Sequence, residues 1–302
     1  MNKVKILILT FLFLMAGALL LMADIIIVYT SGQCKIDKYG NDNWVSANNY
    51  IQLLEKSIIK TGEGGAIEIE IDGQTIAIGE NTTVSLNYIM ANMKKKRKLG
   101  WFKSFSGLFG KKGTGNTALL GVRGAKAEGK EEEMDWIGDE SELEGPGTKL
   151  DNAIALYSEK KYANAIQILE ELLKDKSFTE RRDEDSFYLG SFYFEGLQYD
   201  KAAKYLGDCI KNAEDTPYYE EALIKYAFSE YFQENYKEAI SGFRNYAEKF
   251  KNSETTPFAL LMIGKSYKEM GQDDNARRYL NKVMNMYKGS EASAEAAAEL
   301  KN

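Results

Sequence analysis

Two glutamates, Glu68 and Glu70, come nearest to catalytic chemistry by type and spacing. A pair of carboxylates in a cleft can hydrolyse a glycosidic bond. These two alternate with isoleucines in IEIEI, which instead predicts a strand whose acidic face lies in water. The chain has no histidine, no phosphate-binding Gly-Lys-Ser/Thr loop, no dinucleotide glycine fingerprint and no Cys-x-x-Cys pair. We therefore predict a non-enzymatic protein without a catalytic, metal or cofactor site.

The composition allows two ordinary globular domains. The chain has 302 residues, of which 44% are hydrophobic and 28% charged. A net charge of −6 gives no overall signature of nucleic-acid binding, and we expect neither a nucleic acid nor a small-molecule substrate as partner. The two cysteines, Cys34 and Cys209, lie in regions of different pattern, which favours free thiols over a disulfide.

The N-terminus has the pattern of an export signal. Two lysines precede an apolar run at residues 6–23. Cleavage could follow Ala18 or Ala23, but the run is also long enough to remain as a membrane anchor. Residues 1–23 are thus predicted to be a signal peptide or an anchor. Either outcome places the rest of the chain in the periplasm, free or attached to the inner membrane.

Residues 24–128 are predicted to form a small all-β sandwich or roll. In IEIEIDGQTIAIG, the isoleucines at 67, 69 and 71 share one face, and the turn falls at Asp72-Gly73. The same alternation continues in TTVSLNYI, residues 82–89, and flanking segments at 25–36 and 117–128 also resemble strands.

The landmarks of this region resemble the FecR-like domain. They are Thr61-Gly62, Asp72-Gly73, Asn81-Thr82 and the group Gly121, Arg123 and Gly124, with Ala125 where threonine is usual. The resemblance implies an exported regulator or an envelope protein. Regulators of this family hold a sigma factor with a long cytoplasmic segment, whereas only five residues precede the apolar run here. A FecR-type transmembrane signalling regulator is therefore the alternative interpretation.

A basic insert at residues 93–113 interrupts the β-region, and an acidic linker follows at 129–148. The insert combines lysines with aromatic residues at helical spacing. One hypothesis is an interfacial helix on anionic lipid; the other is a short helix that covers one end of the sandwich. The candidate membrane-contact residues are Lys94, Lys95, Lys96, Arg97, Lys98, Trp101, Phe102, Phe105 and Phe109.

From residue 149 to 302 the sequence repeats itself every 37 residues. Ala165, Ala202, Ala239 and Ala276 occupy equivalent places, which predicts helix pairs stacked as a solenoid. The segments LGSFY and IGKSY, with a Tyr-x-x-Ala pattern in the next helix, resemble the tetratricopeptide repeat. We predict four units and a capping helix. Glycines at 190 and 264 are expected where paired helices approach too closely for a β-carbon.

The concave face of such a stack is the predicted binding surface for a protein partner. Aromatic residues recur there and could hold a helix or an extended peptide. Alternatively, the rings pack inside the superhelix or against the preceding domain. The candidate groove residues are Tyr157, Phe194, Phe228, Tyr231, Phe232 and Lys268.

The sequence as a whole predicts an α+β multidomain protein. Its predicted function is that of a non-catalytic, exported envelope scaffold that binds other proteins through its repeats. The FecR-like domain would supply contacts with the envelope, such as an anionic membrane surface or the cell wall.

Overall fold

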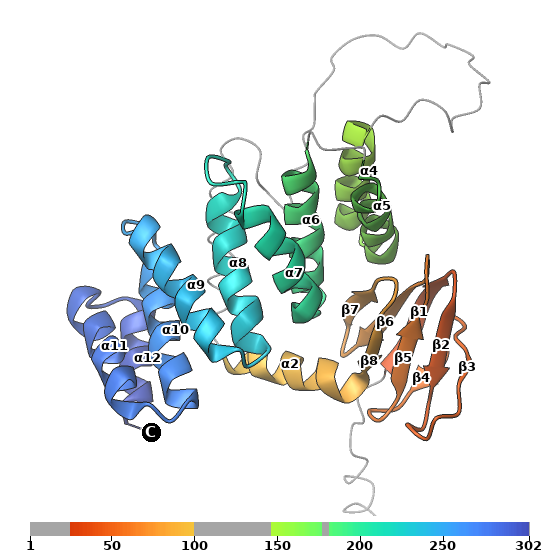
Figure 1. The fold of residues 1–302 in the computed structure, drawn as a ribbon. Helices are drawn as coiled ribbons and strands as arrows, with labels where there is room; N and C mark the ends of the chain where they lie inside the picture. Colours follow the sequence, from red (N-terminus) through yellow and green to blue (C-terminus); the bar gives the residue numbers. More distant parts are fainter. Residues whose placement is uncertain (1–24, 100–145, 177–180, 302) are drawn as a thin grey trace, which may run out of the picture.

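The computed structural model describes residues 25–99, 146–176 and 181–301 (Figure 1). The signal segment, the predicted strand at 117–128, the aromatic part of the basic insert and most of the acidic linker lie outside these residues. Within them, an N-terminal β-region is followed by a helical solenoid. No helix of the described part is both long and apolar enough to cross a membrane.

Within residues 25–99, the β-region is a sandwich of two four-stranded antiparallel sheets. The first sheet has the order β4-β1-β6-β7, and the second has the order β3-β2-β5-β8. The strands are β1 (Ile25–Ser31), β2 (Cys34–Asp37), β3 (Val45–Ser46), β4 (Gln52–Leu53), β5 (Ile58–Thr61), β6 (Ala66–Ile71), β7 (Gln74–Ile78) and β8 (Thr83–Ser85).

The predicted hairpin is confirmed. Strands β6 and β7 pair from Ile67↔Ile78 to Ile71↔Gln74, so the turn consists of Asp72 and Gly73. Both turn residues have positive φ, 51° and 75°, as a two-residue hairpin turn requires. The isoleucines of both strands are buried between the sheets.

The strand predicted at residues 82–89 is wrong beyond Ser85, because a helix begins there. Helix α2 (Leu86–Lys98) starts where the Ser85 side chain accepts a hydrogen bond from the Tyr88 backbone N–H. Leu86, Ile89 and Met93 are buried at a spacing of three and four residues. Over such a short apolar run, the pattern of a strand and the pattern of a helix cannot be told apart, and the Ser85 cap favours the helix.

In residues 146–176 and 181–301, the helical half consists of four helix pairs and a last helix. The pairs stack side by side in chain order, and each first helix packs on its second (Figure 1). The helices are α4 (Pro146–Ser158), α5 (Tyr162–Lys174), α6 (Arg182–Glu195), α7 (Tyr199–Ile210), α8 (Tyr219–Phe232), α9 (Tyr236–Lys249), α10 (Thr256–Glu269), α11 (Asp273–Met286) and α12 (Glu291–Glu299).

Close helix contacts explain the glycines inside these helices. A β-carbon on Gly190 would lie 2.7 Å from Leu206 Cγ and 2.9 Å from the Leu206 backbone nitrogen. A β-carbon on Gly264 would lie 2.8 Å from a Leu280 methyl group. The third unit has alanine at the equivalent place, Ala227, and Gly242 of α9 faces it, where an added β-carbon would come within 2.9 Å of the alanine methyl. In the third unit, the glycine that allows the close approach therefore lies in the second helix.

Candidate protein-binding surface

The predicted aromatic groove is not an open surface. Phe194, Phe228, Tyr231 and Phe232 are at most 3% exposed. The structure therefore corrects the expectation of an accessible ring ladder, and the alternative of internally packed rings holds for these four. Their ring partners include the second helices of the same units: Phe194 with Tyr199, Phe228 with Phe243, and Tyr231 with Tyr236.

The two ends of the predicted groove are also engaged. Tyr157 is half-buried, and its ring stacks on Phe192 of the next unit with centroids 3.8 Å apart. Lys268 donates hydrogen bonds to the backbone carbonyl and carboxylate of Glu299 in α12, at 2.9 and 3.0 Å. A partner could not reach the central rings without moving helices of the stack.

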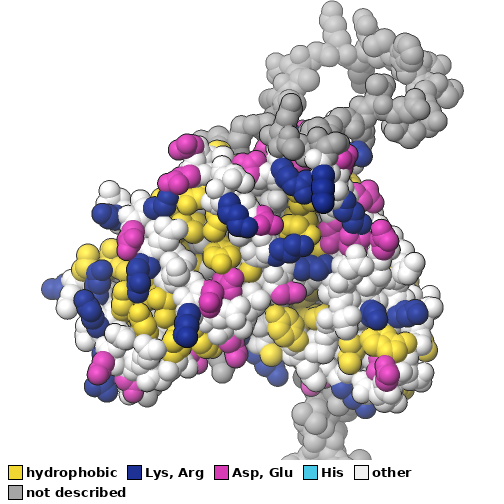
Figure 2. All heavy atoms as spheres, in the orientation of Figure 1, with side chains coloured by type: hydrophobic (Ala, Val, Ile, Leu, Met, Phe, Trp, Pro, Cys, Tyr) yellow, Lys and Arg dark blue, Asp and Glu magenta, His cyan; other side chains and the backbone are white. Residues whose placement is uncertain are grey.

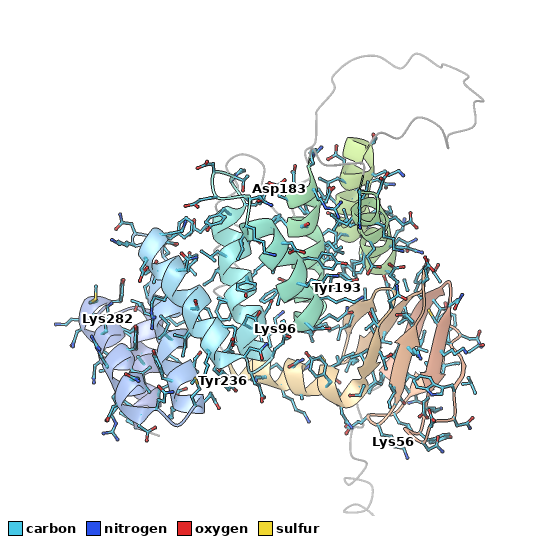
Figure 3. The ribbon with its side chains drawn as sticks, in the orientation of Figure 1. Lys56, Lys96, Asp183, Tyr193, Tyr236 and Lys282 are labelled. Carbon is cyan, nitrogen blue, oxygen red and sulfur yellow. The ribbon has the colours of Figure 1, made fainter. Side chains whose placement is uncertain are left out.

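Helix α2 uses part of the basic insert to contact the repeats. Lys95 Nζ lies 3.2 Å from Glu234 Oε1 and 5.5 Å from the centre of the Tyr231 ring. Lys96 Nζ lies 3.4 Å from Glu195 Oε2. Figure 3 shows Lys96 and Tyr236 where α2 passes beside the ends of α8 and α9. These two lysines therefore face protein in the described fold.

Of the other candidate membrane-contact residues, only Lys94 and Arg97 have described side chains. Lys94 is exposed, and Arg97 pairs with Asp72 at 3.2 Å on the β-hairpin turn. The side chain of Lys98 and residues Trp101, Phe102, Phe105 and Phe109 lie outside the described residues. Contact of the insert with lipid stays a prediction.

A buried polar network joins the β-region to the first two repeat units. Tyr193 of α6 donates a short hydrogen bond to Glu170 of α5. Lys201 of α7 donates to the Glu80 carbonyl at 2.6 Å and to the Tyr193 hydroxyl at 3.1 Å. Lys174 pairs with the Glu80 carboxylate at 2.7 Å. Residues from three helices and the β7–β8 turn thus form one connected site.

Burial sets the electrostatics of this network. It raises the pKa of Glu170 and lowers the pKa of Lys201, since desolvation penalises both charged forms. Burial also acts to raise the pKa of Glu80, but the Lys174 ammonium and the Gly64 N–H outweigh it and hold that pKa below its ordinary value. The arrangement joins the β-region to the repeats, with Lys174 exposed at its edge.

Close packing between the domains supports the network. Gly79 lies so near α5 and α6 that an added β-carbon would meet the Tyr193 hydroxyl and come within 2.9 Å of an Ile166 methyl. Gln198 donates a short hydrogen bond to the Ala77 carbonyl, and Gln167 donates to the Gly64 carbonyl at 3.0 Å. In Figure 3, Tyr193 lies beside the strands at this junction.

Glu68, predicted to face water, belongs to the same junction. It is 7% exposed, and its carboxylate accepts a hydrogen bond of 2.6 Å from the Ala163 backbone N–H. Ala163 lies in the first turn of α5, where backbone N–H groups have no partner within the helix. Burial raises the pKa of Glu68. Glu70, on the same strand, is exposed as predicted.

An open cleft of about 650 Å³ lies over this junction between α5, α6 and α7. Its wall carries more cations than anions, and Figure 2 shows Lys and Arg side chains gathered over α6 and α7. The charged lining residues are Glu80, Glu170, Lys174, Arg182, Asp183, Lys201, Lys204, Asp208 and Lys211.

The acids of this cleft are already engaged by the protein. Glu80 and Glu170 belong to the buried network, and Asp208 pairs with Lys211 at 2.7 Å. Asp183 accepts a hydrogen bond from the Tyr218 hydroxyl at 2.9 Å. Lys204 extends over the Tyr205 ring at 4.9 Å and has no ion-pair partner in the described part of the chain. Because Lys174, Lys201 and Lys211 pair with these same acids, the positive charge that the cleft can offer a partner comes from Lys204 and Arg182, and it suits carboxylates.

Comparison with protein families identifies the helical half. Residues 158–246 match the model of the anaphase-promoting complex, cyclosome, subunit 3, and residues 258–290 match a tetratricopeptide repeat model. The C-terminal part of the chain is therefore built of tetratricopeptide-type repeats, as predicted. Neither match reaches the β-region, whose resemblance to FecR-like domains stays a prediction. A comparison with curated proteins gave no match.

Solved structures with similar helices include MamA and a kinesin light chain. A MamA protein of strain AMB-1 is 21% identical, covers 50% of this chain and 78% of its own, and gives a TM-score of 0.41. MamA of Desulfovibrio magneticus RS-1 is 16% identical over 49% of this chain and 78% of its own, with a TM-score of 0.40. A putative kinesin light chain of Podospora anserina, with nearly identical TPR-like repeats, is 14% identical over 51% and 84%, also with a TM-score of 0.40. These scores support no inference about a partner.

The described residues contain no cluster of three or more His, Cys, Asp or Glu side chains suited to a metal ion.

The sequence patterns did not predict the junction between the domains, because the residues in contact there are distant along the chain. Glu80 and Lys201, for example, are 121 residues apart.

Proposed function

We propose that the protein is a non-catalytic, exported scaffold of the cell envelope whose repeats bind another protein. Tetratricopeptide-type repeats typically mediate contacts between proteins, and the N-terminal sequence has the pattern of an export signal. In this proposal the β-region supplies envelope contacts, as its resemblance to FecR-like domains implies. Mass spectrometry of the mature N-terminus tests export: a chain that still begins at Met1 and is found in the cytoplasm refutes that part.

The cleft between α5 and α7 is the observation that carries the proposed binding site. The central rings of the concave face are buried, whereas this cleft is open and lined by five Lys and Arg side chains. Arg182 is held at its edge by hydrogen bonds to the carbonyls of Leu173 and Asp175, at 2.7 and 3.3 Å. The matching partner is an extended protein segment that carries carboxylates.

Site-specific crosslinking in the intact envelope tests this site. A photo-reactive residue replaces Lys204 in the cleft or, as a control, Lys282 on the exposed face of α11 at the far end of the stack (Figure 3). We expect a defined adduct at position 204 only. Its purified protein component should bind the wild-type chain and lose at least tenfold in affinity for the Arg182→Glu variant.

Two results would count against the proposal. Equal adducts at 204 and 282 would show that the cleft is not selective. An affinity that does not change in Arg182→Glu or with added salt would show that the cleft cations do not bind the partner, since interactions of exposed charges are screened by salt.

A further inference from the structure

Two lysines stand directly opposite each other on the outer face of the second sheet. Lys35 of β2 pairs in register with Lys60 of β5, and both side chains are exposed. Neither forms an ion pair within the described residues. Like charges directly opposite on neighbouring strands are destabilising, so this pair costs stability in the free protein. An anion bound between the ammonium groups would remove the cost.

An indole ring lies beside this pair. Trp44, the residue before the edge strand β3, is half-exposed, and Lys60 Nζ lies 5.9 Å from the centre of its ring. The indole N–H donates a hydrogen bond of 2.6 Å to Asp42 Oδ1. The ring is therefore held in place before any ligand arrives, which lowers the entropic cost of binding.

The loop that carries Asp42 is itself fixed by a buried carboxylate. Asp37 accepts hydrogen bonds from the backbone N–H groups of Tyr39 and Asp42, at 3.1 and 2.7 Å. Asp42 adopts a left-handed φ of 66°, a conformation that aspartate tolerates better than most residues. The indole and the lysine pair thus form a preorganised surface.

Hydroxyl and amide groups complete the surface. Ser46 is the register partner of Lys35 on its other side, and Thr83 is the partner of Lys60, so one exposed row crosses all four strands. Asn41 and Asn43 are exposed in the adjoining loop. Hydroxyl and amide side chains both donate and accept hydrogen bonds, as recognition of a polyhydroxylated ligand requires.

We propose that this outer face of the second sheet binds an acidic polysaccharide. The indole would stack on the apolar face of one sugar, the lysine pair would bind a carboxylate, and Ser46, Thr83 and the asparagines would bond hydroxyls. A polynucleotide fits less well, because its dense phosphates demand a more basic protein than one of net charge −6. The inference names a ligand for the envelope contacts of the β-region and rests on that part of the proposed function, but it does not depend on the partner of the repeats.

The repeats leave this face accessible. Their contacts involve the β5–β6 loop, the β6–β7 hairpin and the β7–β8 turn, whereas Lys35, Ser46 and Lys60 lie on the outer face of the second sheet. In Figure 3, the neighbouring Lys56 lies at the end of the β-region remote from the helix stack. A polysaccharide and a protein partner could bind the same molecule together.

Affinity electrophoresis of the full chain through polygalacturonate, a polymer of sugar carboxylates, tests the inference. We expect retardation of the wild type and at least a tenfold loss of affinity in Trp44→Ala and in Lys35→Gln with Lys60→Gln. The matched control Lys56→Gln removes a neighbouring exposed lysine and should stay within twofold of the wild type. The double lysine variant should also unfold at the same or a higher temperature, because it relieves the repulsion.

Several outcomes would overturn the inference. These are no retardation of the wild type, equal retardation by neutral dextran, or an equal loss in Lys56→Gln. Tighter binding of a single-stranded oligonucleotide than of polygalacturonate would assign the face to nucleic acid instead. Because the double lysine variant is expected to fold at least as stably as the wild type, its loss of binding could not be attributed to unfolding.

Discussion

The substitution Gly190→Ala measures how closely the helices of the second unit approach each other. Its added methyl would lie 2.7 Å from Leu206 Cγ and 2.9 Å from the Leu206 backbone nitrogen, both below normal contact distances. Because a backbone atom is involved, α7 as a whole must shift. Overpacking costs about 1–3 kcal/mol, and the contact with a backbone atom places this case at about 2–3 kcal/mol, while alanine recovers about 1 kcal/mol of helix propensity. We expect a net loss of about 1–2 kcal/mol in the free energy of unfolding.

Gly264→Ala is the matched control in the fourth unit. Its added methyl would meet only the side chain of Leu280 below 3.4 Å, at 2.8 and 3.0 Å, and a leucine side chain can rotate away. We expect a change of less than about 1 kcal/mol, of either sign. Urea unfolding followed by far-ultraviolet circular dichroism compares the two variants. Equal stability of Gly190→Ala and wild type, or a larger loss in Gly264→Ala, would refute the packing argument.

Three further predictions concern buried groups. Burial raises the pKa of Asp185 in α6 from 3.8 to about 6, against the nearby Arg181 and Arg182 and with Glu184 and Asp183 adding to the rise. The folded state therefore favours the protonated acid, and the free energy of unfolding falls as pH rises from about 4 to about 6. In thermal unfolding, Asp185→Asn should add up to about 3 kcal/mol of stability at pH 7.5 but nothing near pH 4. Gly79→Val should separate the β-region from α5 and α6 and increase proteolysis of the junction, whereas Gly73→Asn at the exposed hairpin turn should not; equal cleavage in both variants would contradict the close contact. Lys201→Met removes the cation that pairs with Glu170 and should destabilise the fold by about 3–5 kcal/mol at neutral pH. Adding Glu170→Gln should recover part of this loss, and no recovery would show that the two groups are not coupled.

Local patterns in the sequence predicted most of the architecture. The 37-residue spacing of the alanines at 165, 202, 239 and 276 depends on a helix pair repeated in sequence, and the described part of the repeats has four pairs with a last helix. The alternating isoleucines and the Asp72-Gly73 turn predicted the hairpin because each strand has one buried face. In both cases the information lies within a few dozen residues.

The wrong predictions concern side chains that are covered by distant parts of the chain. Glu68 alternates with isoleucine as a solvated residue would, yet its partner Ala163 lies 95 residues away in the repeats. The recurrence of Phe194 and Tyr231 at one repeat position was visible, but periodicity does not indicate whether that position is exposed. Repeat position and exposure are separate properties, and only tertiary packing determines the second.

The glycine contact at the domain junction has a mechanical consequence. With Gly79 pressed against Ile166 and the Tyr193 hydroxyl, the sandwich and the first two helix pairs cannot slide past each other without breaking buried hydrogen bonds. If the sandwich is held by a fixed polymer while a bound protein pulls on the repeats, tension passes directly through this joint. The molecule would then act as a rigid spacer that fixes the distance between its two binding sites.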